Sequence, residues 1–298
     1  MQYNIIARIA EGIGNQLFMF ANAYYLSRKF NYNLLLDNTS GYFKKKNQIR
    51  TFELDKFDLK STIANDNLKF DTYPLDIKRK LLKIIDIFKK KKIFFIEKRD
   101  SNKNTFFDPI NIDELSKTFY IEGHFECERY FDELRSDLIK LIKVKKEYLC
   151  NENPYVNHLK NSNSVSICVR QNRYSEGRIK NNDKSSKLTK DTIDYIYRSV
   201  DYIKQKVDKP KFFLWSNDFK NLKEYFNEDE FLFINNKNNK ALNDFHLFNF
   251  CKHFIVGPTS FHWWGAWLNN NPNKICIRPQ NINLSSNKDF WPLNWIKI

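Results

Sequence analysis

Short apolar runs alternate with a longer amphipathic segment at the start of the chain. Tyr3 to Arg8 and Leu34 to Leu36 are apolar runs, and Leu17 to Phe30 carries apolar side chains at helical spacing. Between the first run and the helical segment, Glu11 to Gln16 reads as a loop with two glycines. A strand, a helix and a second strand in this order predict a βαβ unit, which favours a parallel sheet with a right-handed crossover.

The next part of the chain, residues 40–118, has a weaker pattern. Its clearest feature is the segment from Ile77 to Arg99, in which four apolar side chains fall on one helical face: Leu81, Ile84, Ile85 and Phe88. The lysines Lys89 to Lys92 follow directly. Such a run is more often a solvated helix end, and contact of a basic amphipathic helix with an anionic membrane is the alternative interpretation.

The middle of the chain adds one strand and one helical pattern before a polar stretch. Phe119 to Gly123 is predicted as a strand and Tyr130 to Lys143 as a helix. Asn151 to Ser164 is mostly polar, as linkers are. We therefore expect two domains, residues 1–155 and residues 156–298.

The second half repeats the alternation of strands and helices. Four or five apolar runs are predicted as strands: Val165 to Val169, Lys211 to Trp215, Phe231 to Ile234, Phe254 to Val256 and Ile275 to Ile277. Three segments between them have helical spacing: Thr189 to Lys206, Asn221 to Phe226 and Ala241 to Cys251. This alternation predicts a second, doubly wound α/β domain.

The stretch from Val256 to Leu268 reads V-G-P-T-S-F-H-W-W-G-A-W-L. Gly257 tolerates unusual backbone angles and Pro258 has no N–H group, so the strand is expected to end there. Thr259 or Ser260 can cap the helix that follows, and its tryptophans are expected to pack in the core. A helix that begins at the carboxyl edge of a sheet presents unpaired N–H groups and a positive dipole end, which suits phosphate binding.

Three separated motifs resemble those of a known family. The stretch S-F-H-W-W-G-A-W-L, which starts at Ser260, is similar to the C-terminal motif of glycosyltransferase family 11, the α-1,2-fucosyltransferases. G-I-G-N-Q-L-F, Gly12 to Phe18, is similar to that family's opening G-G-L-G-N-Q-L-F, and Tyr120 to Phe131 resembles its G-Y-W-Q-S-E-K-Y-F segment. The resemblance implies a GT-B type α/β fold of two Rossmann-like domains that face a cleft, with the acceptor on the N-terminal side and the nucleotide-sugar on the C-terminal side.

Transfer of a sugar from a nucleotide diphosphate requires that the charge growing on the leaving diphosphate be neutralised and that the acceptor hydroxyl lose a proton. The sequence has no Asp-x-Asp after a strand, the motif that metal-dependent transferases use. Three arginines, Arg170, Arg173 and Arg178, instead follow the run Val165 to Val169. Because the planar guanidinium binds phosphate with two parallel hydrogen bonds, these arginines are candidates for the diphosphate site, with an exposed basic loop as the alternative for the last two.

The stretch S-I-C-V-R-Q-N-R-Y-S-E is similar to the family's H-x-R-R-x-D-Y motif, whose arginines hold the donor diphosphate. Arg170 matches the first arginine and Tyr174 the tyrosine. Cys168, Gln171 and Arg173 stand where the motif has His, Arg and Asp. The resemblance implies diphosphate binding and a catalytic role for Arg170, whereas the departures indicate a different donor or a different pose.

The same resemblance implies five more donor contacts: Ser216, Asp218, Asp244, Ser260 and His262. Asp218 lies in L-W-S-N-D, which is similar to the family's F-S-D-D, with Asn217 in place of a carboxylate; capping of a turn or helix is the alternative for Asp218. Asp244 precedes an apolar helix where it is expected to contact the base. His262 stands where the family usually has Ser, which again indicates an altered donor.

The acceptor side is predicted from the N-terminal loop, because its glycines let the backbone approach a sugar or phosphate, with a tight turn as the alternative. The residues predicted there are Gly12, Gly14, Asn15 and Gln16. Glu11 beside this loop is a candidate general base. The other candidates are Glu122, Glu126, Glu176 and His124.

Composition narrows the possible partners. The chain has 298 residues and a net charge of +15, which favours an anionic partner such as a nucleotide diphosphate or a membrane surface. No recognisable nucleic-acid module appears, and the five cysteines contain no C-x-x-C pair that would indicate zinc. The sequence has neither a long apolar run nor a signal-peptide layout, so we expect a cytoplasmic protein that contacts the inner face of the membrane peripherally.

These observations lead to one functional hypothesis with two alternatives. The chain is expected to be an inverting glycosyltransferase without metal or other cofactor; the resemblance implies transfer of fucose from GDP-fucose to a galactose hydroxyl of a surface-glycan oligosaccharide. Inversion follows from single displacement of a β-linked donor to an α-linked product. The alternatives are a transferase of the same fold with another nucleotide-sugar, and a non-catalytic basic protein that binds membrane or nucleic acid.

Overall fold

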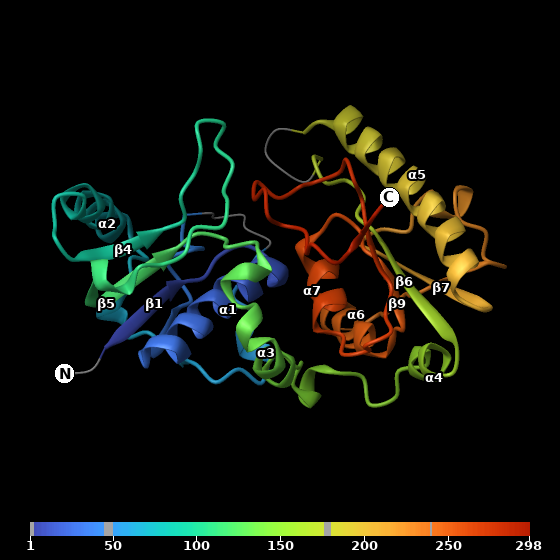
Figure 1. Ribbon diagram of the computed structural model, residues 1–298, viewed down its shortest axis with the longest axis horizontal. Helices are drawn as coiled ribbons and strands as arrows, with labels where there is room; N and C mark the ends of the chain where they lie inside the picture. The colour runs from blue at the N-terminus through green and yellow to red at the C-terminus, as the bar shows by residue number, and fades with distance from the viewer. Residues whose placement is uncertain (1–2, 45–49, 176–179, 239) are drawn as a thin grey trace. The chain divides into compact units, whose positions relative to one another are not determined.

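The computed structural model describes residues 3–44, 50–175, 180–238 and 240–298. The chain divides into two compact units, each with its own sheet. The first comprises Met1–Lys143 and Ser285–Pro292, and the second comprises Val144–Leu284 and Leu293–Ile298. The α/β class predicted for both halves is confirmed (Figure 1).

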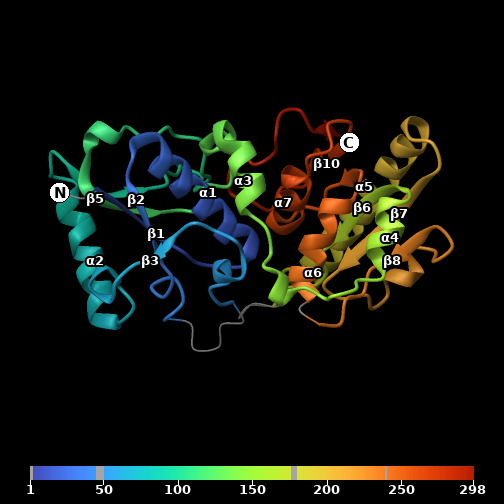
Figure 2. The same ribbon diagram turned by 90° about the horizontal axis from the view of Figure 1, so that it is seen from below.

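The first unit contains a five-stranded parallel sheet of order β3-β2-β1-β5-β4. Its strands are β1 Asn4–Arg8, β2 Asn33–Asp37, β3 Thr62–Ile63, β4 Lys92–Ile96 and β5 Leu115–Glu122. Its helices are α1 Ile13–Phe30, α2 Tyr73–Asp86 and α3 Arg135–Leu141. Helices α1 and α2 lie on opposite faces of the sheet (Figures 1 and 2). The central residues of β1 are all buried, as expected of a parallel strand covered on both faces.

The second unit contains a six-stranded parallel sheet of order β11-β10-β9-β6-β7-β8. Its strands are β6 Asn163–Val169, β7 Pro210–Ser216, β8 Phe231–Phe233, β9 His253–Ile255, β10 Cys276–Arg278 and β11 Ile296–Lys297. Its helices are α4 Tyr155–Lys160, α5 Asn182–Lys206, α6 Lys240–Leu247 and α7 Ser260–Leu268. Helix α5 covers one face and α6 and α7 the other (Figure 1), so the predicted doubly wound arrangement is confirmed.

The boundary between the two units follows Lys143, whereas the sequence pattern predicted it after residue 155. The polar stretch taken for a linker belongs to the second unit, because the Cys150 N–H donates to Asn243 Oδ1 (3.0 Å) and Asn153 Nδ2 donates to Asn236 Oδ1 (2.8 Å). Its polar side chains therefore contact the protein itself.

The C-terminal part of the chain is also not wholly in the second unit. Ser285–Pro292 returns to the first unit, where the Thr105 N–H donates to the Ser286 carbonyl and the Phe107 N–H donates to Asp289 Oδ2, both at 2.9 Å. These hydrogen bonds are made by backbone and a short polar side chain, which leave no pattern in the sequence. Phe290 of the same segment is buried, with its ring centre 6.1 Å from that of Phe18.

Four predicted helices are shorter than expected. Asn221 to Phe226 contains only the 3-10 turn Leu222–Glu224, and Ala241 to Cys251 is α-helical only to Leu247. The segment from Ile77 to Arg99 is helical only to Asp86, and its continuation forms strand β4. The Asp86 carboxylate stops the helix, because it accepts hydrogen bonds from the Ile93 and Phe94 N–H groups at 2.9 to 3.0 Å. The segment from Tyr130 to Lys143 is helical only over α3, after two short 3-10 turns.

The C-terminal motif forms the expected strand, turn and helix. Thr259 caps α7, since its Oγ1 accepts from the His262 N–H at 3.1 Å. The tryptophans of α7 are core residues: Trp263, Trp264 and Trp267 are at most 3% exposed. Gly257 is required for close approach rather than for an unusual backbone angle, because a Cβ at this position would lie 2.2 Å from the Cys168 carbonyl oxygen. No helix in the described ranges is long and apolar enough to cross a membrane.

Candidate functional site

The second unit brings the predicted donor motifs to one edge of its sheet. Arg170 follows β6, Ser216 ends β7, and the turn into α7 follows β9. β6 lies between β9 and β7, and all three run parallel, so these segments leave the sheet at neighbouring carboxyl ends. The chain passes from β6 to β7 on one side and reaches β9 on the other, which makes the gap between β6 and β9 the topological switch point where α/β sheets bind ligands.

Helix α7 directs its N-terminus to this edge. Ser260 is its first residue, and the helix runs for nine residues to Leu268. The positive dipole end of the helix and the guanidinium of Arg170 thus follow adjacent strands, and both kinds of group can bind a phosphate without a metal.

His262 does not face a donor, which corrects the prediction of a direct contact. Its side chain is fully buried, its Nδ1 accepts from the Gly257 N–H at 3.0 Å, and its Nε2 lies 2.8 Å from Ser166 Oγ. Because a backbone N–H only donates, Nδ1 carries no proton, and Nε2–H donates to the hydroxyl. Burial lowers the pKa of His262 to about 3, so the imidazole is neutral and holds the Gly257 turn against β6.

Two of the sequence departures from the family motif contact each other. The Gln171 N–H donates to Asn217 Oδ1 at 2.8 Å, and Asn217 Nδ2 donates to the Gln171 carbonyl at 3.3 Å. The Gln171 amide in turn donates to the carbonyls of Asp218 (2.7 Å) and Lys220 (2.9 Å). This neutral pair ties the loop after β6 to the loop after β7.

Ser216 and Asp218 make hydrogen bonds within the loop after β7. The Asp218 N–H donates to Ser216 Oγ at 3.2 Å, and Asp218 Oδ1 accepts from the Lys220 N–H at 2.9 Å. The second carboxylate oxygen lies 3.4 Å from Asn172 Nδ2. The turn-capping alternative for Asp218 is therefore confirmed, and Ser216 is buried beneath it.

The remaining positions of the arginine motif differ in their surroundings. Arg170 is half-buried at the end of β6, whereas Arg173 is exposed. The Tyr174 N–H donates to Ser185 Oγ at 2.8 Å, and Lys184 Nζ lies 4.2 Å from the centre of its ring. Arg178, together with Glu176, lies outside the described residues.

Cys168, which replaces the family histidine, is buried, and burial raises the pKa of its thiol to about 12. This position therefore supplies neither charge nor a thiolate to a ligand.

Asp244 is a buried carboxylate on α6. It is 5% exposed, and its Oδ1 accepts from Asn236 Nδ2 at 2.6 Å. Burial raises the pKa of Asp244 to about 6, although the hydrogen bond from Asn236 and the charge of Lys240 act in the opposite direction. A carboxylate buried to this extent costs stability, which is typical of functional residues.

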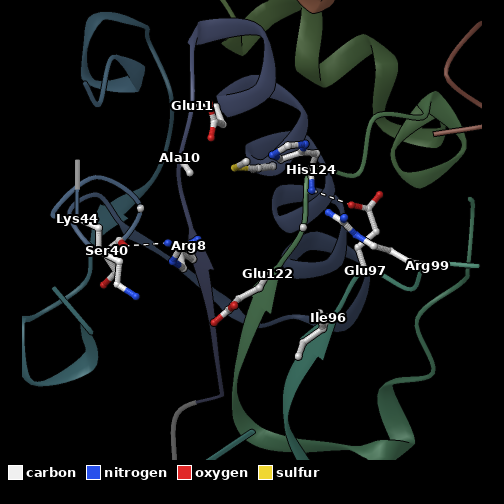
Figure 3. A pocket seen from close by; sticks show the side chains of 13 residues that line it. Arg8, Ala10, Glu11, Ser40, Lys44, Ile96, Glu97, Arg99, Glu122 and His124 are labelled. Atoms are coloured by element: carbon white, nitrogen blue, oxygen red, sulfur yellow. Dashed lines mark hydrogen bonds between the residues drawn. The ribbon is translucent and has the colours of Figure 1, made fainter. Parts of the chain in front are cut away.

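The first unit contains a pocket of about 350 Å³ at the carboxyl edge of its sheet. Its walls come from the ends of β1, β4 and β5 and from the loop after β2, as Figure 3 shows. The side chains that define it are Arg8, Glu11, Lys44, Glu97, Arg99, Glu122 and His124. β1 lies between β2 and β5, so this pocket also lies at a topological switch point.

Charged side chains shape the floor of the pocket. Arg8 and Glu122 end the neighbouring strands β1 and β5, and Arg8 Nη2 donates to the Ser40 carbonyl at 2.9 Å. One oxygen of Glu122, Oε2, pairs with Arg79 and Lys83 of α2. The other oxygen, Oε1, is buried with no hydrogen-bond partner among the described residues, and Glu122 is one of the residues that line the pocket.

Glu97 holds the wall that carries His124. Its Oε2 accepts from the His124 N–H at 2.8 Å and its Oε1 from the Phe125 N–H at 3.1 Å (Figure 3). Both carboxylate oxygens are therefore used by the loop after β5. Glu126, another candidate base, is also engaged, because Ser285 Oγ donates to it from the returning C-terminal segment.

Glu11 has a strained backbone at the rim of the pocket. Its φ is 65°, a value that side-chain-bearing residues other than Asn and Asp rarely adopt, and its side chain lines the pocket. Gln16 Nε2 and the Tyr42 hydroxyl donate to its carbonyl oxygen at 2.8 and 3.4 Å, which fixes this conformation. Among the candidate bases, Glu11 lines the pocket, whereas the Glu126 carboxylate accepts a hydrogen bond from Ser285.

The predicted glycine loop is shorter than expected, because α1 begins at Ile13. Gly12 is the N-cap residue and Gly14 and Asn15 belong to the first turn. Gln16 is fully buried: its Nε2 also donates to the Thr51 carbonyl and its Oε1 accepts from the Glu53 N–H. The prediction that Gln16 contacts an acceptor is therefore wrong, and its amide instead ties the 51–53 segment to the helix.

Sequence reasoning missed most of the pocket. Arg8, Lys44, Glu97 and Arg99 were not among the candidates, although Arg8 stands at the end of the first apolar run. The one sequence signal for this pocket is Arg8, a charged residue at the carboxyl end of a predicted strand. Glu122, at the end of β5, was a candidate base, but its pairing with α2 was not visible in the pattern.

Comparisons with known proteins agree with this arrangement. The chain matches the family described as Glycosyl transferase family 11 over residues 4–298. It is 28% identical to the alpha-1,2-colitosyltransferase of Escherichia coli over 303 residues, covering 99% of this chain and 98% of that protein. It is 25% identical to the O-antigen biosynthesis glycosyltransferase WbnK of Escherichia coli, covering 97% and 99%.

Solved structures with the same fold include two fucosyltransferases. The NodZ alpha-1,6-fucosyltransferase soaked with GDP-fucose superposes with a TM-score of 0.51 at 15% identity and covers 90% of this chain and 93% of that one. A mutant of Arabidopsis thaliana FUT1 in complex with GDP gives a TM-score of 0.50 at 12% identity and covers 94% and 71%. The chain belongs to glycosyl transferase family 11 and is a glycosyltransferase with a GT-B type α/β fold.

Proposed function

We propose that the protein is an inverting, metal-independent glycosyltransferase that moves fucose from GDP-fucose to a galactose hydroxyl of a surface-glycan oligosaccharide, with an α-1,2 linkage. The observation that carries the proposal is the position of Arg170 and the start of α7 on adjacent strands at the switch point of a family 11 chain. The α-1,2 linkage in the name of one relative and the O-antigen in the name of the other support the linkage and the acceptor class.

On this proposal the second unit holds the donor. The Arg170 guanidinium takes the diphosphate oxygens, and the N-terminus of α7 adds its positive end as charge grows on the leaving group. Asp244 accepts hydrogen bonds from the base; guanine, with adjacent N1–H and N2–H donors, suits a carboxylate better than uracil does. Inversion follows from a single displacement, in which the acceptor oxygen forms its bond as the bond to the diphosphate breaks.

The pocket of the first unit takes the acceptor. Arg8 and Glu122 line it, and a guanidinium and a carboxylate offer donors and acceptors to sugar hydroxyls. Glu11 is the general base that removes the proton of the attacking hydroxyl. Its strained backbone holds the carboxylate at the rim.

A second candidate is transfer of another sugar from a nucleotide-sugar donor. It is favoured by the neutral Gln171–Asn217 pair, which stands where the family motif has charged residues. The name of the 28% identical relative, which specifies colitose, also supports a donor sugar other than fucose.

The donor is tested by thermal unfolding with GDP, UDP, dTDP, CMP and GDP-fucose at equal concentration, with EDTA present throughout. A ligand at about 100 times its dissociation constant adds about 2.7 kcal/mol to the free energy of unfolding. We expect stabilisation by GDP and GDP-fucose alone, and fucosyl transfer that persists in EDTA. Stabilisation by another nucleotide would show that the donor is not GDP-fucose. Activity that returns only with Mn²⁺ would refute metal independence.

Arg170→Ala is expected to lower transfer about 10² to 10³-fold, because a positioned cation no longer meets the diphosphate charge. The GDP-induced rise in melting temperature should fall with it, while the melting temperature without ligand stays near that of the wild type. Arg198→Ala, an exposed arginine on α5, is the matched control. Normal turnover by a folded Arg170→Ala protein would remove the proposed role.

Glu11→Gln is expected to lower kcat at least about 10²-fold with little change in the KM for the donor, because only proton removal is lost. The comparison variant is His124→Gln at the facing wall of the pocket. A larger loss of kcat in the histidine variant would transfer the role of base to His124.

Asp244→Asn is expected to raise the free energy of unfolding at high pH and to weaken GDP binding. Since the folded pKa is about 6 and the ordinary value is 3.8, the stabilising effect of the protonated carboxyl is full below about pH 4 and is lost as the pH rises through 6. The variant should therefore be more stable than the wild type at pH 8, by no more than about 3 kcal/mol, and should lose GDP-induced stabilisation. The exposed Asp194→Asn on α5 serves as control, and a variant that keeps the GDP response has no base contact at Asp244.

A further inference from the structure

Exposed apolar side chains are concentrated on one helix of the first unit. Within the described part of the chain thirteen large apolar side chains are exposed, and seven of them lie between Tyr73 and Phe88. They are Tyr73, Ile77, Leu81, Ile84, Ile85, Ile87 and Phe88, with exposed fractions from 53% to 84%. Single exposed apolar residues are ordinary, but a group of this kind marks an interaction surface.

Six of these residues form a continuous stripe along α2 and its end. From Ile77, the residues Leu81, Ile84, Ile85 and Phe88 follow at i+4, i+7, i+8 and i+11, and Tyr73 precedes at i−4. This spacing places them on one face of the helix. We name this stripe the α2 apolar face.

The opposite face of α2 is charged and packs against the protein. Arg79 pairs with Asp76 at 2.7 Å and with Glu122 of β5 at 2.6 Å, and Lys83 also pairs with Glu122. Lys44 adds a further contact to Asp76. Although burial alone would raise the pKa of Asp76, the hydrogen bonds and charges of Lys44 and Arg79 hold it at about 2, so this carboxylate stays ionised.

The helix is thus turned the other way from an ordinary surface helix, which buries its apolar face and exposes its charges. Rotation to bury the apolar face would break the ion pairs with Glu122 and leave buried charges without partners, which is strongly unfavourable. Figure 1 shows α2 beside β4, at the edge of the first unit. The orientation is explained if the apolar face is covered by something outside the described chain.

The charges around the apolar face identify the chemistry of that partner. Lys78 and Lys80 are exposed on the flanks of α2, and Lys90 is exposed just beyond its end. The acidic residues of the helix, Asp76 and Asp86, are both buried. The face therefore presents apolar side chains with a rim of lysines, which complements acyl chains beneath anionic headgroups.

A second copy of the chain fits this surface less well. In a two-fold contact the same residues meet each other, so the lysine rim would face a lysine rim. We propose that the α2 apolar face inserts into the interface of an anionic lipid bilayer and holds the first unit there. This binding does not depend on the proposed sugar transfer.

Membrane docking at α2 would also act on the pocket. Glu122 and Lys44 contact the charged face of α2 and line the pocket. If the acceptor pocket is as proposed above, a docked α2 places it within reach of a glycan carried on a lipid.

The test is co-sedimentation of the full-length protein with vesicles of phosphatidylcholine alone and of phosphatidylcholine with phosphatidylglycerol. We expect binding to the anionic vesicles and at least about tenfold weaker binding of the double variant Leu81→Ser, Phe88→Ser, because two apolar side chains are removed from the interface. Leu293→Ser, which removes an apolar side chain that is 94% exposed in the second unit, should bind like the wild type.

Charge is tested separately with Lys90→Glu, which should weaken binding several-fold at low salt, and with the exposed Lys190→Glu on α5 as its control. Absence of vesicle binding by the wild type, or equal loss in Leu293→Ser, would overturn the proposal. Sedimentation velocity without lipid completes the test: a wild-type dimer that the double variant dissociates would show that a second copy covers the face instead. Because turnover on a soluble acceptor is measured independently, failure of membrane binding is distinguishable from failure of the proposed function.

Discussion

A neutral, buried imidazole holds together the edge of the second sheet where the donor motifs meet. His262 accepts from the Gly257 N–H and donates to Ser166, so it joins the turn after β9 to the interior of β6. Burial keeps the pKa of this side chain at about 3, and both nitrogens are satisfied without a charge. The start of α7 and the exit of Arg170 from β6 are therefore fixed relative to each other, as the proposed diphosphate site requires.

At the same edge, two residues that differ from the family motif contact each other, Gln171 and Asn217. The neutral contact between Gln171 and Asn217 keeps the loops after β6 and β7 together without a charged pair. Positive charge is lost at one position, while the backbone that carries Arg170 is retained.

In the first unit the ionic contacts of α2 connect two features that are distant in sequence. Glu122 ends β5 at the pocket, and its pairing with Arg79 and Lys83 fixes α2 with its charged face inward. The apolar residues of α2 then face outward. One buried carboxylate thus contributes both to the pocket floor and to the orientation of the helix, since one of its oxygens pairs with α2 and the other does not.

The sequence alone determined the fold class, the βαβ opening and five of the six strands of the second sheet, because apolar runs report burial on both faces directly; the two-residue strand β11 was too short to predict. The motifs at the two ends of the chain also indicated the family, and the apolar run Val165 to Val169 placed Arg170 at the carboxyl end of a strand. It did not determine the unit boundary, since Cys150 and Ser286 are held by backbone and amide hydrogen bonds that leave no apolar pattern. Nor did it determine which polar residues are structural: Gln16 and His262 looked like ligand contacts and are buried partners of the backbone. Only the tertiary structure decided these points, because a polar side chain is assigned to the fold or to a site by what lies next to it in space.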